Sequence, residues 1–150
     1  MKKEYYAGID PGQSGAVAFI DRNSDFIESH LCPATPQEMD EIIKRFPSDD
    51  LFACLELAHA FPKQGVSGVF NYGKNFGIWI GILAANKIPY EIISPQKWCK
   101  LIGAQKGESK TKAWEFAQRR WFESKLKLKK HQAIAEALVI AEFGRLLKGG

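Results

Sequence analysis

The sequence YAGIDPGQSG, residues 6–15, places one carboxylate at the end of an apolar run. The β-rich runs EYYAGID and GAVAFID lie on either side of PGQS, which is typical of two antiparallel strands joined by a tight turn. Pro11, Gly12 and Gly15 favour that reversal. A carboxylate beside a buried strand must be paired, protonated or bound to a cation. Asp10 is therefore the first candidate for a functional residue.

The rest of the chain alternates strand-like and helix-like segments. A third β-rich run, residues 26–34, completes a predicted antiparallel meander over residues 4–34. Thr35, Pro36 and Glu38 have the residue types expected at the N-cap and in the first turn of a helix. We expect further strands and helices in the order strand 51–58, helix 71–86, strand 89–95, helix 109–122 and helix 131–147. This order predicts an α/β fold.

The composition is that of one globular domain. The chain has 150 residues, of which 45% are hydrophobic and 25% charged, so we expect a single domain over residues 1–150. No apolar run is long enough to cross a bilayer, and the first residues lack the apolar core of a secretory signal. We therefore expect a cytoplasmic protein without a membrane partner. Cys32, Cys54 and Cys99 form no CxxC pair, which argues against a disulfide framework or a zinc site.

Positive charge is concentrated in one part of the sequence. Residues 97–130 contain eleven Lys and Arg but three acids, whereas the net charge of the whole chain is only +4. Such a segment suits a polyanionic partner, because each neutralised phosphate releases counterions. A solvated surface rich in lysine would have the same composition. Charge alone leaves the two interpretations open.

Three acids occupy positions where an apolar residue would be expected. Asp10 ends the first strand, Glu56 lies in the apolar run LFACLELA, and Glu136 lies among alanines and isoleucines of the last helix. Brought together, three carboxylates would repel one another unless a cation lay between them, and Mg²⁺ or Mn²⁺ prefers such oxygen ligands. The alternative is that each acid is partly exposed and has its own Lys or Arg partner.

Four stretches together resemble a known family. GIDPGQSGAVAFID, LELAHAFPKQGVSGVFNYGKNFGIWIGILAA, SPQKW and KHQAIAEALVIAEFG resemble the RuvC-type Holliday junction resolvases, and most closely their bacteriophage-encoded relatives. The resemblance covers nearly the whole chain. It implies a ribonuclease H-like fold, with a five-stranded mixed sheet flanked by helices. It also implies a homodimer that nicks opposed strands of a Holliday junction or other branched DNA with two divalent metal ions, in a bacterial or phage-infected cell.

The resemblance assigns the candidate catalytic residues. Asp10, Glu56 and Glu136 would bind Mg²⁺, for which Mn²⁺ could substitute. Gln132 stands where relatives usually carry a fourth metal-binding acid, and it could offer a neutral oxygen as a ligand. His131 is a possible substitute, although it points about 100° away from Gln132 in a regular helix. The site is then either attenuated in cleavage or a binding site without cleavage.

The resemblance also suggests DNA contacts. Aromatic side chains in GVSGVFNYGKNFG could stack on unpaired bases, although apolar helices more often bury their aromatics. A histidine follows Glu56 and resembles the phage pattern, and lysines surround the expected start of a helix, where phosphate is favoured. The candidate DNA-binding residues are His59, Phe70, Tyr72, Lys74, Lys106, Lys110 and Lys112. Trp98, Trp114 and Trp121 are assigned to packing.

Two other functions remain as alternatives. One is a junction-binding protein without cleavage, which a metal-dependent cleavage assay on four-way DNA would distinguish. The other is a phosphotransferase of the actin-like superfamily, in which an Asp-x-Gly loop also follows a strand. It is disfavoured because 150 residues leave no room for a second duplicated domain, and the sequence contains no second such loop.

Overall fold

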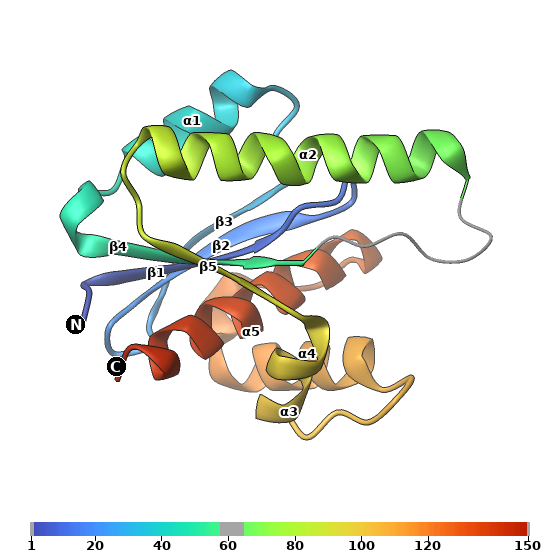
Figure 1. Ribbon diagram of the computed structural model, residues 1–150. Coiled ribbons are helices and arrows are strands. Elements are labelled where there is room, and N and C mark those ends of the chain that lie inside the picture. The colour runs from blue at the N-terminus through green and yellow to red at the C-terminus, as the bar shows by residue number, and fades with distance from the viewer. Residues whose placement is uncertain (1, 58–64, 150) are drawn as a thin grey trace.

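The computed structural model describes residues 2–57 and 65–149, which form a mixed five-stranded sheet flanked by helices (Figure 1). The strand order is β3-β2-β1-β4-β5. β1 pairs antiparallel with β2 and parallel with β4, so it occupies the centre of the sheet. The strands are β1 Tyr5–Asp10, β2 Ala16–Asp21, β3 Phe26–Leu31, β4 Leu51–Glu56 and β5 Tyr90–Ile93. The predicted meander and the predicted fold class are confirmed.

Helices cover both faces of the sheet. In Figure 1, α1 and α2 lie above it and α3, α4 and α5 lie below it. The upper core joins Ile9 and Phe19 of the sheet to Trp79, and the lower core joins Tyr6 to Leu138. The helices are α1 Pro36–Lys44, α2 Val66–Ala85, α3 Pro95–Leu101, α4 Ser109–Arg120 and α5 Gln132–Leu147, with short 3₁₀ turns η1 Ser48–Asp50, η2 Phe122–Ser124 and η3 Lys129–His131. No helix of the described ranges is long and apolar enough to cross a membrane.

The turn after β1 requires a glycine. The Gly15 amide donates to the Gly12 carbonyl at 2.9 Å, which closes the reversal between β1 and β2. A Cβ added to Gly15 would lie 2.0 Å from the Asp10 carbonyl oxygen, closer than any real contact. Without a side chain at Gly15 the chain can return directly behind Asp10, which leaves the carboxylate at the end of β1 uncovered by its own turn.

The contact between β1 and α5 is equally close. A Cβ added to Gly8 would lie 1.9 Å from the carbonyl oxygen of Ala137 and 2.4 Å from the amide nitrogen of Ala141. The helix backbone therefore packs directly on the central strand. This contact fixes the position of α5 along β1, and with it the position of every side chain that α5 directs toward the sheet.

Several element boundaries differ from the sequence-based expectation, and the third to fifth strands and α4 are each two to three residues shorter than expected. α2 begins at Val66 rather than at residue 71, and a short helix, α3, follows the fifth strand at Ser94-Pro95. α5 begins at Gln132, because His131 belongs to η3 instead. The predicted cap of α1 is confirmed, since the Glu38 amide donates to the Thr35 hydroxyl at 3.2 Å.

We expect Gly8→Ala to lower the free energy of unfolding by roughly 1–3 kcal/mol, as overpacking of a tight interior does. The control is Thr111→Ala on the exposed side of α4, which likewise creates an alanine in a helix. That control should leave stability unchanged or raise it by up to about 1 kcal/mol, because alanine favours helix. Urea unfolding of the three proteins measures the difference. Equal stability of Gly8→Ala and wild type would contradict the close contact.

Candidate active site

Asp10, Glu56 and Glu136 line one cavity of about 1140 Å³. Asp10 and Glu56 are the last residues of the neighbouring parallel strands β1 and β4, which pair Ile9 with Leu55. Alternation along each strand turns both acids toward the face that α5 covers. Glu136 precedes Ala137, the residue whose carbonyl contacts β1. The structure thus brings the three predicted acids to one place.

The cavity makes ionisation of Glu56 unfavourable. Burial, followed by the negative charge of Asp10, raises its pKa from 4.5 to about 7, and Glu136 adds to this effect. The Trp98 indole N–H donates to a Glu56 carboxylate oxygen at 2.6 Å, which opposes the rise. Trp98 is buried in the lower core, as expected, but its role extends beyond packing.

Burial also raises the pKa values of Glu136 and Asp10. Burial and then Asp10 raise the pKa of Glu136 from 4.5 to about 7, against the charge of Lys110 and a hydrogen bond from Gln132. Burial also raises the pKa of Asp10, against a hydrogen bond from the Gly12 amide and the charge of Lys110. All three carboxyl groups therefore lie where a negative charge is poorly stabilised.

Glu142, another acid of α5, is a buried carboxylate whose charge is balanced by neighbouring side chains. Glu142 is buried, yet Arg145 contacts it at 2.7 Å and the Ser24 hydroxyl donates to it at 2.8 Å. Although burial acts to raise the pKa of Glu142, these partners lower it overall. None of the ion pairs formed within the described part of the chain involves Asp10, Glu56 or Glu136. The alternative in which each acid has its own basic partner is thus not favoured.

The donor set suits a hard divalent cation, since it consists of carboxylate oxygens. Within residues 2–57 and 65–149, however, no three His, Cys, Asp or Glu side chains are arranged so that they could hold a metal ion. Trp98 and Gln132 hydrogen-bond two of the three carboxylates. Binding of an ion would require these carboxylates to turn toward one another, and the metal site stays a prediction.

Gln132 makes contacts through its amide nitrogen. This nitrogen donates to the Lys110 carbonyl at 2.8 Å, and the side chain also hydrogen-bonds Glu136. Both partners are acceptors, so the NH₂ group faces them. The predicted role was an oxygen ligand for a metal, and that role remains a prediction. The observed contacts link the last helix to the start of α4.

His131 holds a turn. Its Nδ1 accepts hydrogen bonds from the amides of Lys127 at 3.1 Å and Leu128 at 3.2 Å, which organises the turn before α5. His131 is not among the residues that line the acidic cavity. Its predicted role as a substitute ligand stays untested, and the ring nitrogen nearest the backbone is already engaged.

The candidate DNA-binding residues are distributed unevenly. Tyr72 and Lys110 line the cavity, and a Cβ on Gly12 would lie 3.2 Å from the Tyr72 ring. Burial, and then the charge of the three acids, raises the pKa of Tyr72. The other candidates do not line the cavity: Phe70 and Lys74 are exposed on α2, Lys106 and Lys112 lie outside its lining, and His59 lies outside the described residues.

A further segment, which no local sequence signal indicates, completes the cavity. Lys127, Lys129 and Lys130 line it together with the acids. They belong to the basic stretch already recognised by composition, but nothing local indicated that the segment folds back beside Asp10. The acidic cavity is therefore bordered by exposed lysines.

Comparison with known proteins adds evidence for the fold. The sequence matches no protein-family profile and no curated protein. The structure is similar to "T. thermophilus RuvC in complex with Holliday junction substrate", with a TM-score of 0.70, 18% identity, and coverage of 97% of this chain and 96% of that one. The chain has the RuvC fold. A second match, "Thermus thermophilus RuvC structure", has a TM-score of 0.72, 15% identity and the same coverage.

The raised pKa values of Glu56 and Glu136 predict how the stability of the metal-free protein depends on pH. Glu56 and Glu136 have pKa values of about 7 when folded and ordinary values of 4.5 when unfolded, so the folded protein retains protons that the unfolded chain releases. The free energy of unfolding should fall as pH rises from about 4.5 to about 7. Glu56→Gln should reduce this fall, whereas Glu115→Gln on the exposed face of α4 should not. Thermal unfolding in EDTA across this range tests it, and identical profiles for all three proteins would contradict it.

Proposed function

We propose that this protein is a metal-dependent nuclease that nicks branched DNA, as a Holliday junction resolvase does. The observation that carries the proposal is the acidic cavity at the ends of β1 and β4, bordered by exposed lysines, in a chain with the RuvC fold. A protein that only binds phosphate would gain nothing from three buried acids. A nuclease needs both the acids and the lysines, because the acids can bind a cation and the lysines can bind the DNA backbone.

Mg²⁺ is the proposed cofactor, and Mn²⁺ would substitute for it. Asp10, Glu56 and Glu136 would hold the ions, with Gln132 as the proposed neutral fourth ligand. When bound, the two ions would supply an activated water and stabilisation of the leaving 3′ oxygen. Trp98 hydrogen-bonds Glu56 and Gln132 hydrogen-bonds Glu136, and both carboxylates would turn from these partners to hold the ions.

DNA would reach the cavity over its basic border. Lys110 lies where its charge acts on both Asp10 and Glu136, and it would also attract the phosphate next to them. Tyr72, at the side of the cavity, would contact the same strand. We assign stacking on an unpaired base to Phe70 and the more distant arms of the junction to Lys74, Lys106 and Lys112, with His59 as a further candidate beside the phosphate.

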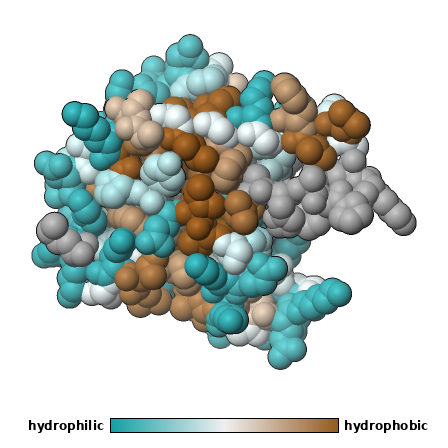
Figure 2. All heavy atoms as spheres, viewed as in Figure 1, coloured by the Kyte–Doolittle hydropathy of each residue, from teal (hydrophilic) through white to brown (hydrophobic). Residues whose placement is uncertain are grey.

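A homodimer would provide the second nick. The outer side of α2 exposes Val66 (88%), and Figure 2 shows apolar residues gathered near this end of the helix. Gly73, Gly77 and Gly81 leave the rest of that side open for close approach of a second helix. Two copies joined there would present two cavities to opposed strands. The motif resemblance further suggests the bacteriophage branch and action in the cytoplasm of a bacterial or infected cell.

A second candidate function is junction binding with weak or absent cleavage. The observation that favours it is Gln132, which places a neutral NH₂ group against Glu136 where relatives carry an acid. Such a group adds no negative charge to a cation site. The protein would then bind and hold branched DNA.

Asp10→Asn should abolish nicking while leaving junction binding largely intact, because Asp10 is assigned to metal and not to DNA. Nicking of a synthetic four-way junction in Mg²⁺, with binding measured in Ca²⁺, separates the two effects. Glu115→Gln is the matched control, since it removes one exposed acid elsewhere. Cleavage by Asp10→Asn at the wild-type rate would show that the site is misplaced.

Gln132→Asp should tighten binding of the second metal and raise the nicking rate, most clearly in Mg²⁺. Each tenfold gain corresponds to about 1.4 kcal/mol of barrier lowering. Single-turnover nicking across a metal titration gives the rate, and the shift in thermal unfolding with Mg²⁺ gives binding without catalysis. If neither the rate nor the metal midpoint changes, residue 132 does not act on the metal.

A further inference from the structure

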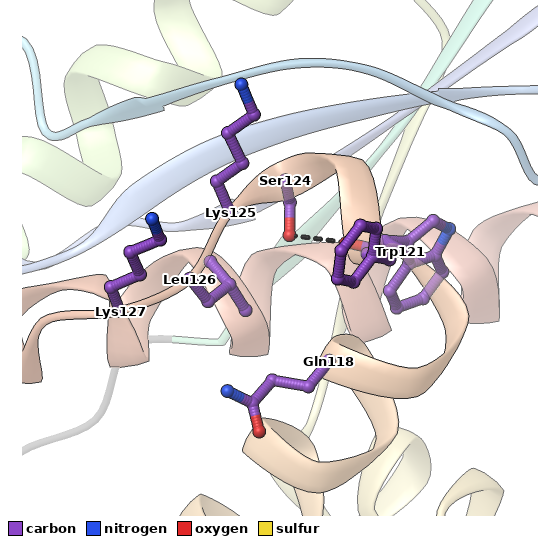
Figure 3. A pocket seen from close by; sticks show the side chains of 7 residues that line it. Gln118, Trp121, Ser124, Lys125, Leu126 and Lys127 are labelled. Carbon is purple, nitrogen blue, oxygen red and sulfur yellow. Dashed lines mark hydrogen bonds between the residues drawn. The ribbon is translucent and has the colours of Figure 1, made fainter.

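A second hollow lies at the corner where α4 ends (Figure 3). Its volume is about 490 Å³. Its lining is largely apolar at the base, with lysines on the loop that borders it. The lining residues are Gln118, Trp121, Phe122, Ser124, Lys125, Leu126 and Lys127.

The corner has a fixed backbone. α4 ends at Arg120, η2 follows, and Lys125 adopts the left-handed conformation with φ 53°. The Lys125 amide donates to the Phe122 carbonyl at 3.2 Å. The Ser124 hydroxyl donates to the Trp121 carbonyl at 2.7 Å, and this hydrogen bond is drawn in Figure 3. The buried Trp121 indole donates to the Ser24 carbonyl at 2.8 Å and so ties the corner to the β2–β3 turn. Any ligand meets a surface that is already ordered.

One aromatic side chain at this corner faces solvent. Phe122 is 82% exposed, whereas Trp121 and Leu126 beside it are 1% and 7% exposed. Trp121 already has an aromatic partner, since the centroids of the Trp121 and Phe116 rings lie 5.6 Å apart. The fold therefore does not use the Phe122 ring as a packing element, and this ring is free to stack on a planar ligand.

The charge around the hollow identifies the ligand. Lys125 and Lys127 extend outward from the loop beside Leu126 in Figure 3, and Arg119 and Arg120 end α4. An aromatic ring among cations suits a base that carries phosphates on either side. Lys127 also lines the acidic cavity, so the two hollows are neighbours that share this residue. A strand whose phosphate lies in the cavity would pass this corner.

We propose that this hollow binds a nucleobase of the DNA strand that the acidic cavity engages. The base stacks on Phe122, and Lys125 and Lys127 neutralise the phosphates beside it. The inference rests on the proposed function, because it takes the strand in the acidic cavity to be DNA. It adds a base contact outside the three-acid cavity, in a hollow that shares only Lys127 with it.

Binding of a four-way junction labelled with 2-aminopurine near the point of strand exchange tests the proposal, in Ca²⁺ and across a salt series. Phe122→Ala should weaken binding roughly fivefold to a hundredfold and relieve quenching of the probe, as loss of one stacked base does. The slope of affinity against salt should not change, because no charge is lost. Phe122→Trp should retain both affinity and quenching. Leu147→Ala, a similarly apolar change at the exposed end of α5, should bind like wild type.

The other outcomes overturn the proposal in distinguishable ways. Junction binding by Phe122→Ala that equals wild type, with quenching retained, overturns the base contact alone. A change of Phe122→Ala from dimer to monomer in sedimentation, with unchanged quenching, overturns it in favour of a second copy of the chain as the occupant. A wild-type protein that binds four-way DNA no more tightly than duplex overturns the proposed function and this inference together.

Discussion

The close packing of α5 on β1 is the constraint on which the rest of the structure depends. Gly8 lacks a side chain, so the Ala137 carbonyl can approach the central strand to a distance that any Cβ would prevent. Gly144 repeats the arrangement further along the helix, where a Cβ would lie 2.9 Å from the Cys54 sulfur. Since Glu136 immediately precedes Ala137, this contact carries its carboxylate to the end of the strand that supplies Asp10.

The same packing explains the electrostatics of the cavity. Burial raises the pKa of Glu56 and Glu136 to about 7, and the charge of Asp10 adds to both rises. Glu142, six residues further along the helix, exposes less of its surface than Glu136 but is paired with Arg145. On the same helix, the charge of Glu142 is therefore balanced by Arg145, whereas the charge of Glu136 has no ion-pair partner within the described residues. That difference supports the assignment of Glu136 to function and Glu142 to structure.

Sequence reasoning reached the sheet and the three acids because both depend on local signals. Alternation and turn residues predicted the meander, and an acid in an apolar run is visible without a structure. The contacts of Trp98 with Glu56 and of Gln132 with the Lys110 carbonyl join residues 42 and 22 positions apart, so no local pattern contains them. α2 begins earlier than expected, because the low helix propensity of Val66, Gly68 and Val69 hides its exposed first turn from local sequence signals.

The most direct test of the account is a crystal of this protein grown with Mn²⁺ and measured for anomalous scattering. The account predicts a peak in contact with carboxylate oxygens of Asp10, Glu56 and Glu136, with Glu56 turned away from the Trp98 indole to reach it. A well-ordered cavity without such a peak at millimolar Mn²⁺, with Glu56 still bonded to Trp98, would contradict the claim that these acids form a metal-dependent nuclease site.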